Sequence, residues 1–247
     1  MRSASRCSPL LALVLAAACS NRPAGAPAGK RVDAATAGSL SGRITFQGVS
    51  PVPQIIKMAS ADPGCGAETQ TSDAVLVGKA GELQNVFVYV TSGLDSAYTF
   101  DVPTEALKFY QRGCRYTPRI FGVRAGQPVE IINDDDTMHN VHALPRTNAE
   151  FNSSQTQKGA TMTRTFAAPE VMVRFKCDVH PWMAAYAGVM AHPFFAVSDA
   201  SGAFEIKGLP PGTYAIDAWH ERFGRQTEQV TIAGRQPQTV AFTFAAK

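Results

Sequence analysis

Hydrophobic and polar residues alternate with the two-residue period of β-strands in several short stretches of this chain. Alternation predicts a strand at Ser41–Phe46, and a continuous apolar run predicts a buried strand at Asn85–Val90. Pro128–Ile132 is predicted to be another strand, ending in a polar turn. We expect one short helical piece of one or two turns at Thr104–Tyr110, with Thr104 as its N-cap. Strands dominate elsewhere, so the pattern predicts an all-β protein.

A further strand is predicted at Val171–Cys177, where apolar and polar residues alternate. Side chains two positions apart point to the same face of a strand. The residues that share the apolar face are Val171, Val173, Phe175 and Cys177. This register directs the Cys177 sulfur toward the core, away from water.

The composition is that of an ordinary globular protein: of 247 residues, 45% are hydrophobic and 17% are charged. This length has room for one large or two small domains and does not limit burial. The chain has neither a basic run nor a basic patch interleaved with aromatic residues, so we expect no nucleic-acid partner.

The first 19 residues are predicted to be a secretory signal. Arg2 and Arg6 form a positive start, and the apolar stretch Pro9–Ala18 is too short to span a bilayer. Ala16–Cys19 resembles a bacterial lipobox, which implies lipidation of Cys19. The usual Leu is missing three positions before Cys19, so ordinary cleavage nearby stays open.

These features predict an exported protein on the periplasmic side of a bacterial membrane, held there by the lipid anchor only or otherwise secreted to the periplasm. Residues 20–37 are predicted to be a flexible linker, being rich in Ala, Pro and Gly. Loss of Arg2 and Arg6 with the signal lowers the net charge from +3 to +1.

Candidate chemistry gathers in Cys177–Met183, which places a thiolate, an imidazole and a thioether within seven residues. A second imidazole, His139, lies upstream beside Asn140. Two His and one Cys with a distant axial Met are the ligands of blue-copper electron-transfer sites. Soft sulfur with imidazole selects copper over calcium or magnesium, which prefer oxygen.

The run CDVHPWM, preceded by HNV, resembles the copper loop of cupredoxins, with the short spacing of amicyanin-type members. The resemblance covers roughly residues 105 to 191. It implies one type 1 copper site, with His180 as a partly exposed imidazole and Asn140 tying the two ligand loops together. The implied ligands are His139, Cys177, His180 and Met183.

Two neighbouring residues have more than one interpretation. Met190 is the second candidate for the axial sulfur, although we expect it to pack the next strand. Trp182 lies either at an apolar patch that meets redox partners, as cupredoxins imply, or buried under the ligand loop.

The other histidines are expected outside the site. His142 follows His139 by three positions and would face the other way on a strand, at the surface or beside the ligands. His192 and His220 are interpreted as packing or turn residues, and a second metal site formed by these three stays open. Asp134–Asp136 lacks the ligand spacing of a calcium loop and is interpreted as a solvated turn.

Each remaining cysteine then has one use. Cys7 leaves with the signal, Cys19 carries lipid and Cys177 carries metal. Cys65 and Cys114 are left, and an exported protein can pair them in a disulfide. Two free buried thiols are the alternative.

The C-terminal segment Ser198–Tyr214 resembles the carboxypeptidase regulatory-like, transthyretin-like β-sandwich. Gly38–Gly48 and Glu82–Val90 look like the opening half of that module. We therefore predict a discontinuous sandwich of residues 38–95 and 194–247, with a Greek-key cupredoxin sandwich of residues 96–193 inserted. The rival is a larger N-terminal cupredoxin followed by a small sheet, and the strand pairing of Val86–Val90 separates the two.

The resemblance implies an electron carrier between donor and acceptor redox proteins, with no catalytic activity of its own. A Cys–His hydrolase built on Cys177 and His180 would lack the helix N-terminus that commonly activates such a thiol. The alternatives that stay open are periplasmic copper storage or delivery, and a structural envelope module.

Overall fold

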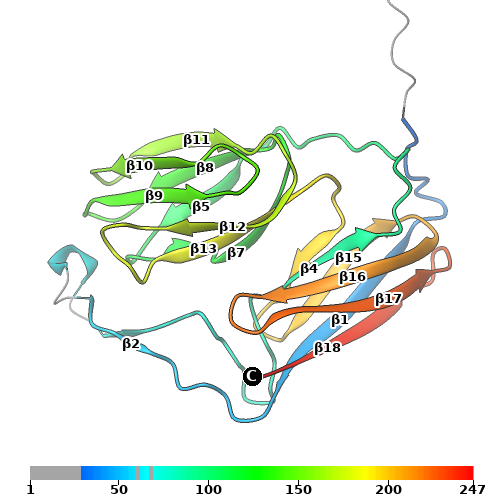
Figure 1. Cartoon of the computed structure of the whole chain (residues 1–247), viewed down its shortest axis with the longest axis horizontal. Coiled ribbons are helices and arrows are strands. Elements are labelled where there is room, and N and C mark those ends of the chain that lie inside the picture. The colour runs from blue at the N-terminus through cyan, green and yellow to red at the C-terminus, as the bar shows by residue number, and fades with distance from the viewer. Residues whose placement is uncertain (1–28, 59–61, 67–68, 247) are drawn as a thin grey trace, which may run out of the picture.

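The computed structural model describes residues 29–58, 62–66 and 69–246. The described chain is built of β-strands that form two sandwiches side by side (Figure 1), so the predicted all-β class is confirmed. The predicted signal and Cys19 lie outside the described residues. No helix among the described residues is long and apolar enough to cross a membrane.

The first sandwich contains nine strands and carries the candidate ligands. They are β5 (Leu107–Gln111), β6 (Tyr116–Thr117), β7 (Ile120–Arg124), β8 (Pro128–Asn133), β9 (His139–Leu144), β10 (Phe151–Gln155), β11 (Thr161–Thr165), β12 (Glu170–Lys176) and β13 (Ala184–Met190). One sheet has the order β10-β9-β12-β13-β7, and the other has the order β11-β8-β5-β6.

Aromatic side chains fill the space between these two sheets. Phe109 of β5 lies 5.2 Å, between ring centroids, from both Phe121 of β7 and Phe175 of β12. All three rings are buried in one apolar cluster, and Cys177 and Met183 belong to the same cluster. Burial of large aromatic rings dominates core energetics, so this core anchors the strands from which the site projects.

The second sandwich contains strands from both ends of the described chain. They are β1 (Gly38–Gln47), β4 (Phe87–Ser92), β14 (Phe195–Val197), β15 (Ala203–Leu209), β16 (Gly212–His220), β17 (Gly224–Ile232) and β18 (Gln238–Ala245). Its sheets have the orders β15-β1-β18 and β14-β4-β16-β17. β4, which contains Phe87–Val90 of the strand predicted from the sequence, pairs with β14 and β16, both after residue 194. The exact domain boundaries stay predictions.

The segment between β1 and β4 leaves the second sandwich, runs along the first to its far end and returns (Figure 1). It contains β2 (Ile55–Ile56), the 3-10 turn η1 (Pro63–Cys65) and β3 (Gln70–Thr71). β2 and β3 pair only with each other. This excursion places η1 beside the loop between β12 and β13, which holds the candidate ligands.

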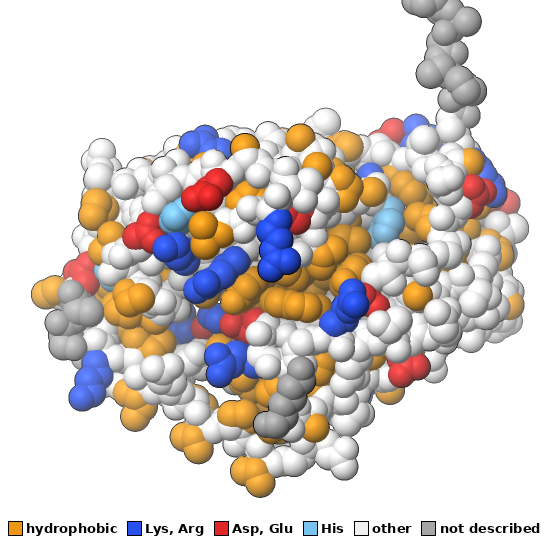
Figure 2. All heavy atoms as spheres, in the orientation of Figure 1, with side chains coloured by type: hydrophobic (Ala, Val, Ile, Leu, Met, Phe, Trp, Pro, Cys, Tyr) orange, Lys and Arg blue, Asp and Glu red, His pale blue; other side chains and the backbone are white. Residues whose placement is uncertain are grey.

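The two sandwiches meet through close apolar contacts and a buried ion pair. A Cβ at Gly188 would lie 2.3 Å from the Phe87 ring, so only glycine lets the ring approach β13. Arg119 Nη2 donates to Glu221 Oε2 at 2.9 Å across the interface. Figure 2 shows apolar surface in the hollow between the sandwiches, with Lys and Arg side chains around it.

The short helix predicted at Thr104–Tyr110 is wrong. The structure places β5 at Leu107–Gln111, paired in parallel with β8. Phe109 and Gln111 are fully buried on one face, as a two-residue period requires. Core burial of this face overrides the weak capping signal of Thr104.

The predicted common face of Val171 and Cys177 is also partly wrong. Val173, Phe175 and Cys177 are buried, but Val171 is 43% exposed. A register shift interrupts the pairing of β12 with β13 between Glu170 and Val173, and Met172 has a φ of 63°. A bulge of this kind adds one unpaired residue and reverses the facing of the residues before it.

Candidate metal centre

Neighbouring strands bring the two ligand segments to one edge of the five-stranded sheet. His139 is the first residue of β9, and Cys177 directly follows β12. β9 and β12 are antiparallel, with Lys176 opposite His142, so the start of one lies beside the end of the other. His180 lies in the loop that leads to β13. The pairing therefore joins residues that are far apart in sequence.

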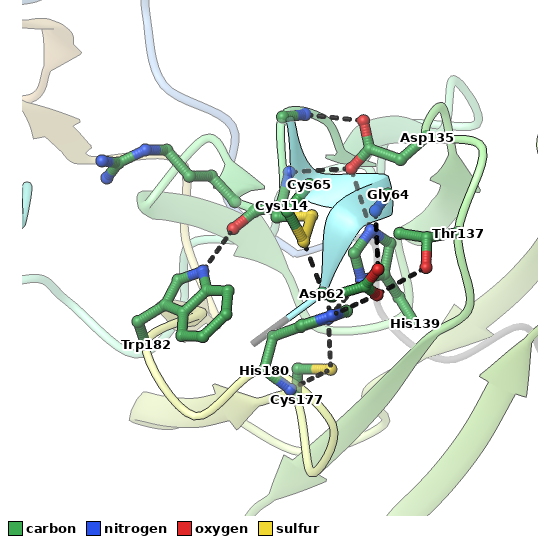
Figure 3. The surroundings of a disulfide bond; sticks show 12 residues. Asp62, Gly64, Cys65, Cys114, Asp135, Thr137, His139, Cys177, His180 and Trp182 are labelled. Atoms are coloured by element: carbon green, nitrogen blue, oxygen red, sulfur yellow. Dashed lines mark hydrogen bonds and ion pairs between the residues drawn. A yellow bond between two sulfur atoms is a disulfide. The ribbon is translucent and has the colours of Figure 1, made fainter. Parts of the chain in front are cut away.

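Three donor atoms converge in this place (Figure 3). The Nδ1 atoms of His139 and His180 lie 2.9 Å apart, and Cys177 Sγ lies 3.8 Å from His180 Nδ1. One ligand atom from each of the three residues fits within 4.8 Å of the others. The residues are 0%, 2% and 1% exposed in the order His139, Cys177, His180. The structure thus brings together three of the four predicted ligands in a buried cluster.

Both imidazoles have their outer nitrogen bound to a carboxylate. His139 Nε2 lies 2.8 Å from Asp135 Oδ2, and His180 Nε2 lies 3.0 Å from Asp62 Oδ2 (Figure 3). A carboxylate accepts a hydrogen bond, so each Nε2 carries the proton and each Nδ1 faces the centre. Such partners fix the tautomer and ring orientation of metal-binding histidines.

The interaction between His139 and Cys177 moves the pKa of each group toward its charged form. Burial lowers the pKa of His139, but its interactions with Asp135 and Cys177 raise it to about 9. Burial raises the pKa of the Cys177 thiol, but the hydrogen bonds with His139 and with backbone groups lower it by more. Cys177 thus ionises more readily than a free cysteine, and the thiolate is the form that binds metals.

His180 differs from His139 in its electrostatics. Burial is the main reason that the pKa of His180 lies below its ordinary value, and the charge of His139 lowers it further. The hydrogen bonds of Asp62 with Thr137 and Gly64 hold the pKa of that carboxyl low. The lowered pKa favours the neutral form of His180, in which Nδ1 has a lone pair.

Asn140 links the two segments that carry the ligands. Its Oδ1 accepts from the backbone N of Asp178 at 2.7 Å and lies 3.3 Å from Cys177 Sγ. Its Nδ2 donates to Asp178 Oδ2 at 3.0 Å. These contacts hold β9 against the loop after β12 and give the sulfur a polar neighbour.

Met183 and Met190 lie in different places. Met183 is 1% exposed and belongs to the same buried cluster as Cys177. Its backbone N donates to His180 O, and its O accepts from the backbone N of Cys177, which closes the loop. Met190 packs in the cluster between the two sandwiches instead. Met183 therefore stays the predicted axial ligand.

The prediction that His180 is partly exposed is wrong. Cys65 Sγ lies 3.5 Å from His180 Nε2, and Asp62 contacts the same nitrogen, so η1 covers the imidazole. The predicted disulfide between Cys65 and Cys114 is present, and the alternative of two free thiols is wrong. The segment that carries Asp62 and Cys65 is thus bonded covalently to the first sandwich.

Trp182 lies beside this covered histidine. Its ring centroid is 5.2 Å from that of His180, and its Nε1 donates to Cys114 O at 2.9 Å. The side chain packs against the core of the first sandwich but is only partly buried. It combines features of both interpretations, an aromatic under the ligand loop and one that reaches the surface.

The other histidines do not join the centre. His142 contacts Asp178 and Glu150, and His192 Nε2 lies 3.1 Å from Val90 O. His220 stacks on Phe223. Within the described ranges, none of the three belongs to a cluster of side chains that could hold a metal.

Sequence reasoning missed the two carboxylates. Asp135 was interpreted as part of a solvated turn, but its side chain accepts from the backbone N of Gly113 and Cys114 and holds His139. Its position four residues before His139 was a possible signal. Asp62 is 118 residues from His180, and no local pattern indicates their contact.

The donor set fits a soft metal ion. The Nδ1 atoms of the two imidazoles lie 2.9 Å apart, and one sulfur completes a buried set of donor atoms that lie within 4.8 Å of one another. Calcium and magnesium take oxygen ligands, and both carboxylates here are engaged with the outer nitrogens. Copper and zinc accept this combination of nitrogen and sulfur.

A comparison with family models finds one match, in the C-terminal part of the chain. Residues 185–245 match the family model of the carboxypeptidase regulatory-like domain. This match begins in β13 and includes β14 to β18, whereas β1 and β4 of the same sandwich lie outside it. No curated protein matches the chain.

Among solved structures, the chain is similar to copper proteins over less than half its length. A purple cupredoxin from Nitrosopumilus maritimus is 20% identical, with 34% of this chain and 99% of that chain covered and a TM-score of 0.30. An oxidized amicyanin mutant is 20% identical, with 42% and 98% covered and a TM-score of 0.32. The copper-containing nitrite reductase of Thermus scotoductus SA-01 is 18% identical, with 41% and 25% covered and a TM-score of 0.33.

Proposed function

We propose that this chain binds one copper ion through His139, Cys177 and His180, with Met183 as axial ligand, and carries single electrons between redox proteins. The ion would supply the one-electron redox change, and the chain's residues would hold it, shield it and set its potential. The proposed carrier has no catalytic activity of its own.

The observation that carries this proposal is the facing pair of Nδ1 atoms. Two nitrogen lone pairs that point at each other across 2.9 Å repel unless a cation lies between them. The proton on His139 fulfils this role in the metal-free protein, because its pKa is raised to about 9. His139, His180 and Cys177 would together hold a metal ion in the place of that proton.

Burial of the ligands supports electron transfer over copper delivery. The three residues are nearly free of solvent, and η1 with the disulfide covers His180. A rigid, dry site changes little when the oxidation state changes, which favours rapid electron transfer. A delivery protein must surrender its ion to a partner, and this cover obstructs that route. The same burial keeps a substrate away from Cys177, which argues against a Cys–His hydrolase.

Trp182 is the proposed place where redox partners approach. His180 itself is covered, but the neighbouring indole contacts it and is partly exposed. A partly exposed aromatic suits the small, weak interfaces of electron-transfer proteins. The proposed location is the periplasmic side of a bacterial membrane, through lipid on Cys19.

One optical and one paramagnetic-resonance spectrum of the copper-loaded protein test the proposal. We expect one equivalent of Cu(II), an intense thiolate-to-copper band in the visible range and reversible one-electron cycling. A colourless Cu(II) complex, or a protein that retains only Cu(I) and passes it to a partner, would contradict the electron-carrier function.

A further inference from the structure

The two carboxylates of the centre are anchored in the same way, each beside one half of the disulfide. Asp62 Oδ1 accepts from the backbone N of Gly64 at 2.7 Å, and Gly64 precedes Cys65. Asp135 Oδ2 accepts from the backbone N of Cys114 itself at 2.8 Å. Figure 3 shows both carboxylates beside the Cys65–Cys114 bond. The positions of both side chains thus depend on backbone that the disulfide fixes.

Each anchored carboxylate in turn holds the Nε2 atom of one histidine. Asp62 Oδ2 contacts His180 Nε2 at 3.0 Å, and Asp135 Oδ2 contacts His139 Nε2 at 2.8 Å. The contacts form one series. It runs from His180 through Asp62 to the disulfide, and from the disulfide through Asp135 to His139. The two imidazoles at the ends of this series face each other through their Nδ1 atoms.

The position of the Asp62 side chain depends on the disulfide more than the position of the Asp135 side chain does. Asp135 lies in the loop between β8 and β9 and belongs to the first sandwich. Asp62 belongs to the excursion between β1 and β4, whose strands β2 and β3 pair only with each other. The disulfide is the covalent connection between this excursion and the first sandwich. Non-covalent contacts hold the excursion as well: Thr137 Oγ1 donates to Asp62 Oδ2 at 2.7 Å, Arg115 Nε donates to Gln70 Oε1 at 2.6 Å, and Met58 packs in the core of the first sandwich.

We propose that the Cys65–Cys114 disulfide is a cross-tie of the metal centre, which holds Asp62 and Asp135 as positioning residues for His180 and His139. The oxidation state of this cysteine pair then controls how firmly both imidazoles present Nδ1 to the ion. A dithiol reductant breaks the S–S bond, the two cysteines become thiols, and the reductant becomes a disulfide. The cross-tie is then lost, and Asp62 is released first. This inference rests on the metal site of the proposed function.

Zinc affinity measured on the full chain tests the cross-tie without any redox chemistry. We expect Asp62→Asn and Asp135→Asn each to weaken Zn(II) binding about 10- to 100-fold, the usual effect of losing such a partner. The double variant Cys65→Ala/Cys114→Ala should fall in the same range. Asp134→Asn is the matched control, because Asp134 lies in the same loop but pairs with Arg112 instead of a histidine. It should bind Zn(II) like the wild type.

Non-additivity shows whether the disulfide acts through Asp62. In the Cys65→Ala/Cys114→Ala variant, Asp62→Asn should reduce the Zn(II) affinity by a smaller factor than in the wild type, because Asp62 is no longer held in position. An equal loss of affinity in both backgrounds, or wild-type affinity in the double-cysteine variant, would overturn the cross-tie.

Nuclear magnetic resonance of the metal-free wild type keeps the test decisive if the double-cysteine variant does not fold. The buried Nε2 protons of His139 and His180 should exchange slowly with water while the disulfide is intact. Reduction by dithiothreitol should speed up exchange at His180 and, to a smaller extent, at His139. Unchanged exchange at both after complete reduction would overturn the proposal.

These measurements separate failure of the cross-tie from failure of the proposed function. If Zn(II) affinity changes as expected in the variants but copper gives no blue spectrum, the electron-carrier proposal is wrong and the cross-tie is supported. If the copper site is blue and reversible but Zn(II) affinity does not depend on the disulfide, the proposed function is supported and the cross-tie is wrong.

Discussion

His139 and His180 face each other through Nδ1 atoms that lie 2.9 Å apart, with their ring planes inclined at 67°. The geometry is that of two ligands arranged around one point. Their Nε2 atoms are bound to Asp135 and Asp62, so neither ring can turn without breaking a hydrogen bond to a carboxylate. The metal-free protein therefore already holds its ligands in place, which lowers the reorganisation needed on binding or on redox change.

Replacing Cys177 by Ser should abolish the thiolate-to-copper colour. The hydroxyl that replaces the sulfur does not ionise near neutral pH and gives no such band. Cys177 follows β12 and is not part of its ladder, so the sheet should persist, with stability lower by about 1–3 kcal/mol from the buried, poorly paired hydroxyl. Visible absorption and far-UV circular dichroism measure both effects. A variant that stays blue would refute the assignment of the ligand.

Copper binding should become tighter as the pH rises toward 9. The proton on His139 competes with the ion for Nδ1, and its pKa is raised to about 9. Below that value the apparent association constant should rise at least about tenfold per pH unit, because His139 releases one proton for each ion bound. Above it the dependence should flatten. Competition titrations with a chelator of known affinity, from pH 6 to 10, measure the slope.

Asp135→Asn provides the control for this slope. Without the carboxylate the pKa of His139 falls, so the plateau should begin at a lower pH than in the wild type. A plateau that stays near pH 9 in this variant would show that Asp135 is not the cause of the raised pKa.

Met183→Leu should leave the blue colour and raise the reduction potential. Leucine keeps the buried volume but removes a thioether that stabilises the oxidised ion, and the axial ligand tunes the potential of such sites. A tenfold change in the relative affinity for the two oxidation states corresponds to about 59 mV. Cyclic voltammetry measures the shift. Met190→Leu is the control and should leave the potential unchanged, because Met190 packs between the sandwiches. Complete loss of copper from Met183→Leu would contradict a weak axial bond.

Three of the four candidate ligands were accessible to sequence reasoning because they are local. Cys177, His180 and Met183 lie in one loop, and the alternation of the preceding strand sets the direction of the sulfur. The strands of the core were predicted for the same reason, because the pattern of a strand is visible within a few consecutive residues. The bulge at Met172 defeated that reasoning at Val171, where one extra residue reverses the facing of the chain.

The cover on His180 could not be predicted from local pattern. Asp62 meets His180 across 118 residues of sequence, from a segment that lies outside both sheets of the first sandwich. Cysteine counting did predict the disulfide, but not its place beside the metal ligands. His180 is buried because Asp62 and Cys65 contact it, and these contacts join residues that are distant in sequence.

His220 should make the metal-free protein less stable in mild acid. Burial lowers the pKa of His220 to about 4, and the charges of Arg119 and Arg222 lower it further. In the unfolded chain the pKa is about 6.5. Between these values the unfolded state binds a proton that the folded state does not, so stability falls as the pH drops below about 6.5 and this loss is complete below about pH 4. The expected loss between pH 7 and pH 5 is about 2 kcal/mol.

His220→Asn isolates this contribution. The amide oxygen of Asn can replace Nδ1, which accepts from the backbone N of Arg222 at 3.1 Å, but the amide does not titrate. Urea unfolding of both proteins at pH 7 and pH 5 measures the difference, because the other titrating groups contribute equally to each. The variant should lose about 2 kcal/mol less than the wild type over this interval. Equal losses in the two proteins would mean that His220 is protonated in the folded state as easily as in the unfolded chain.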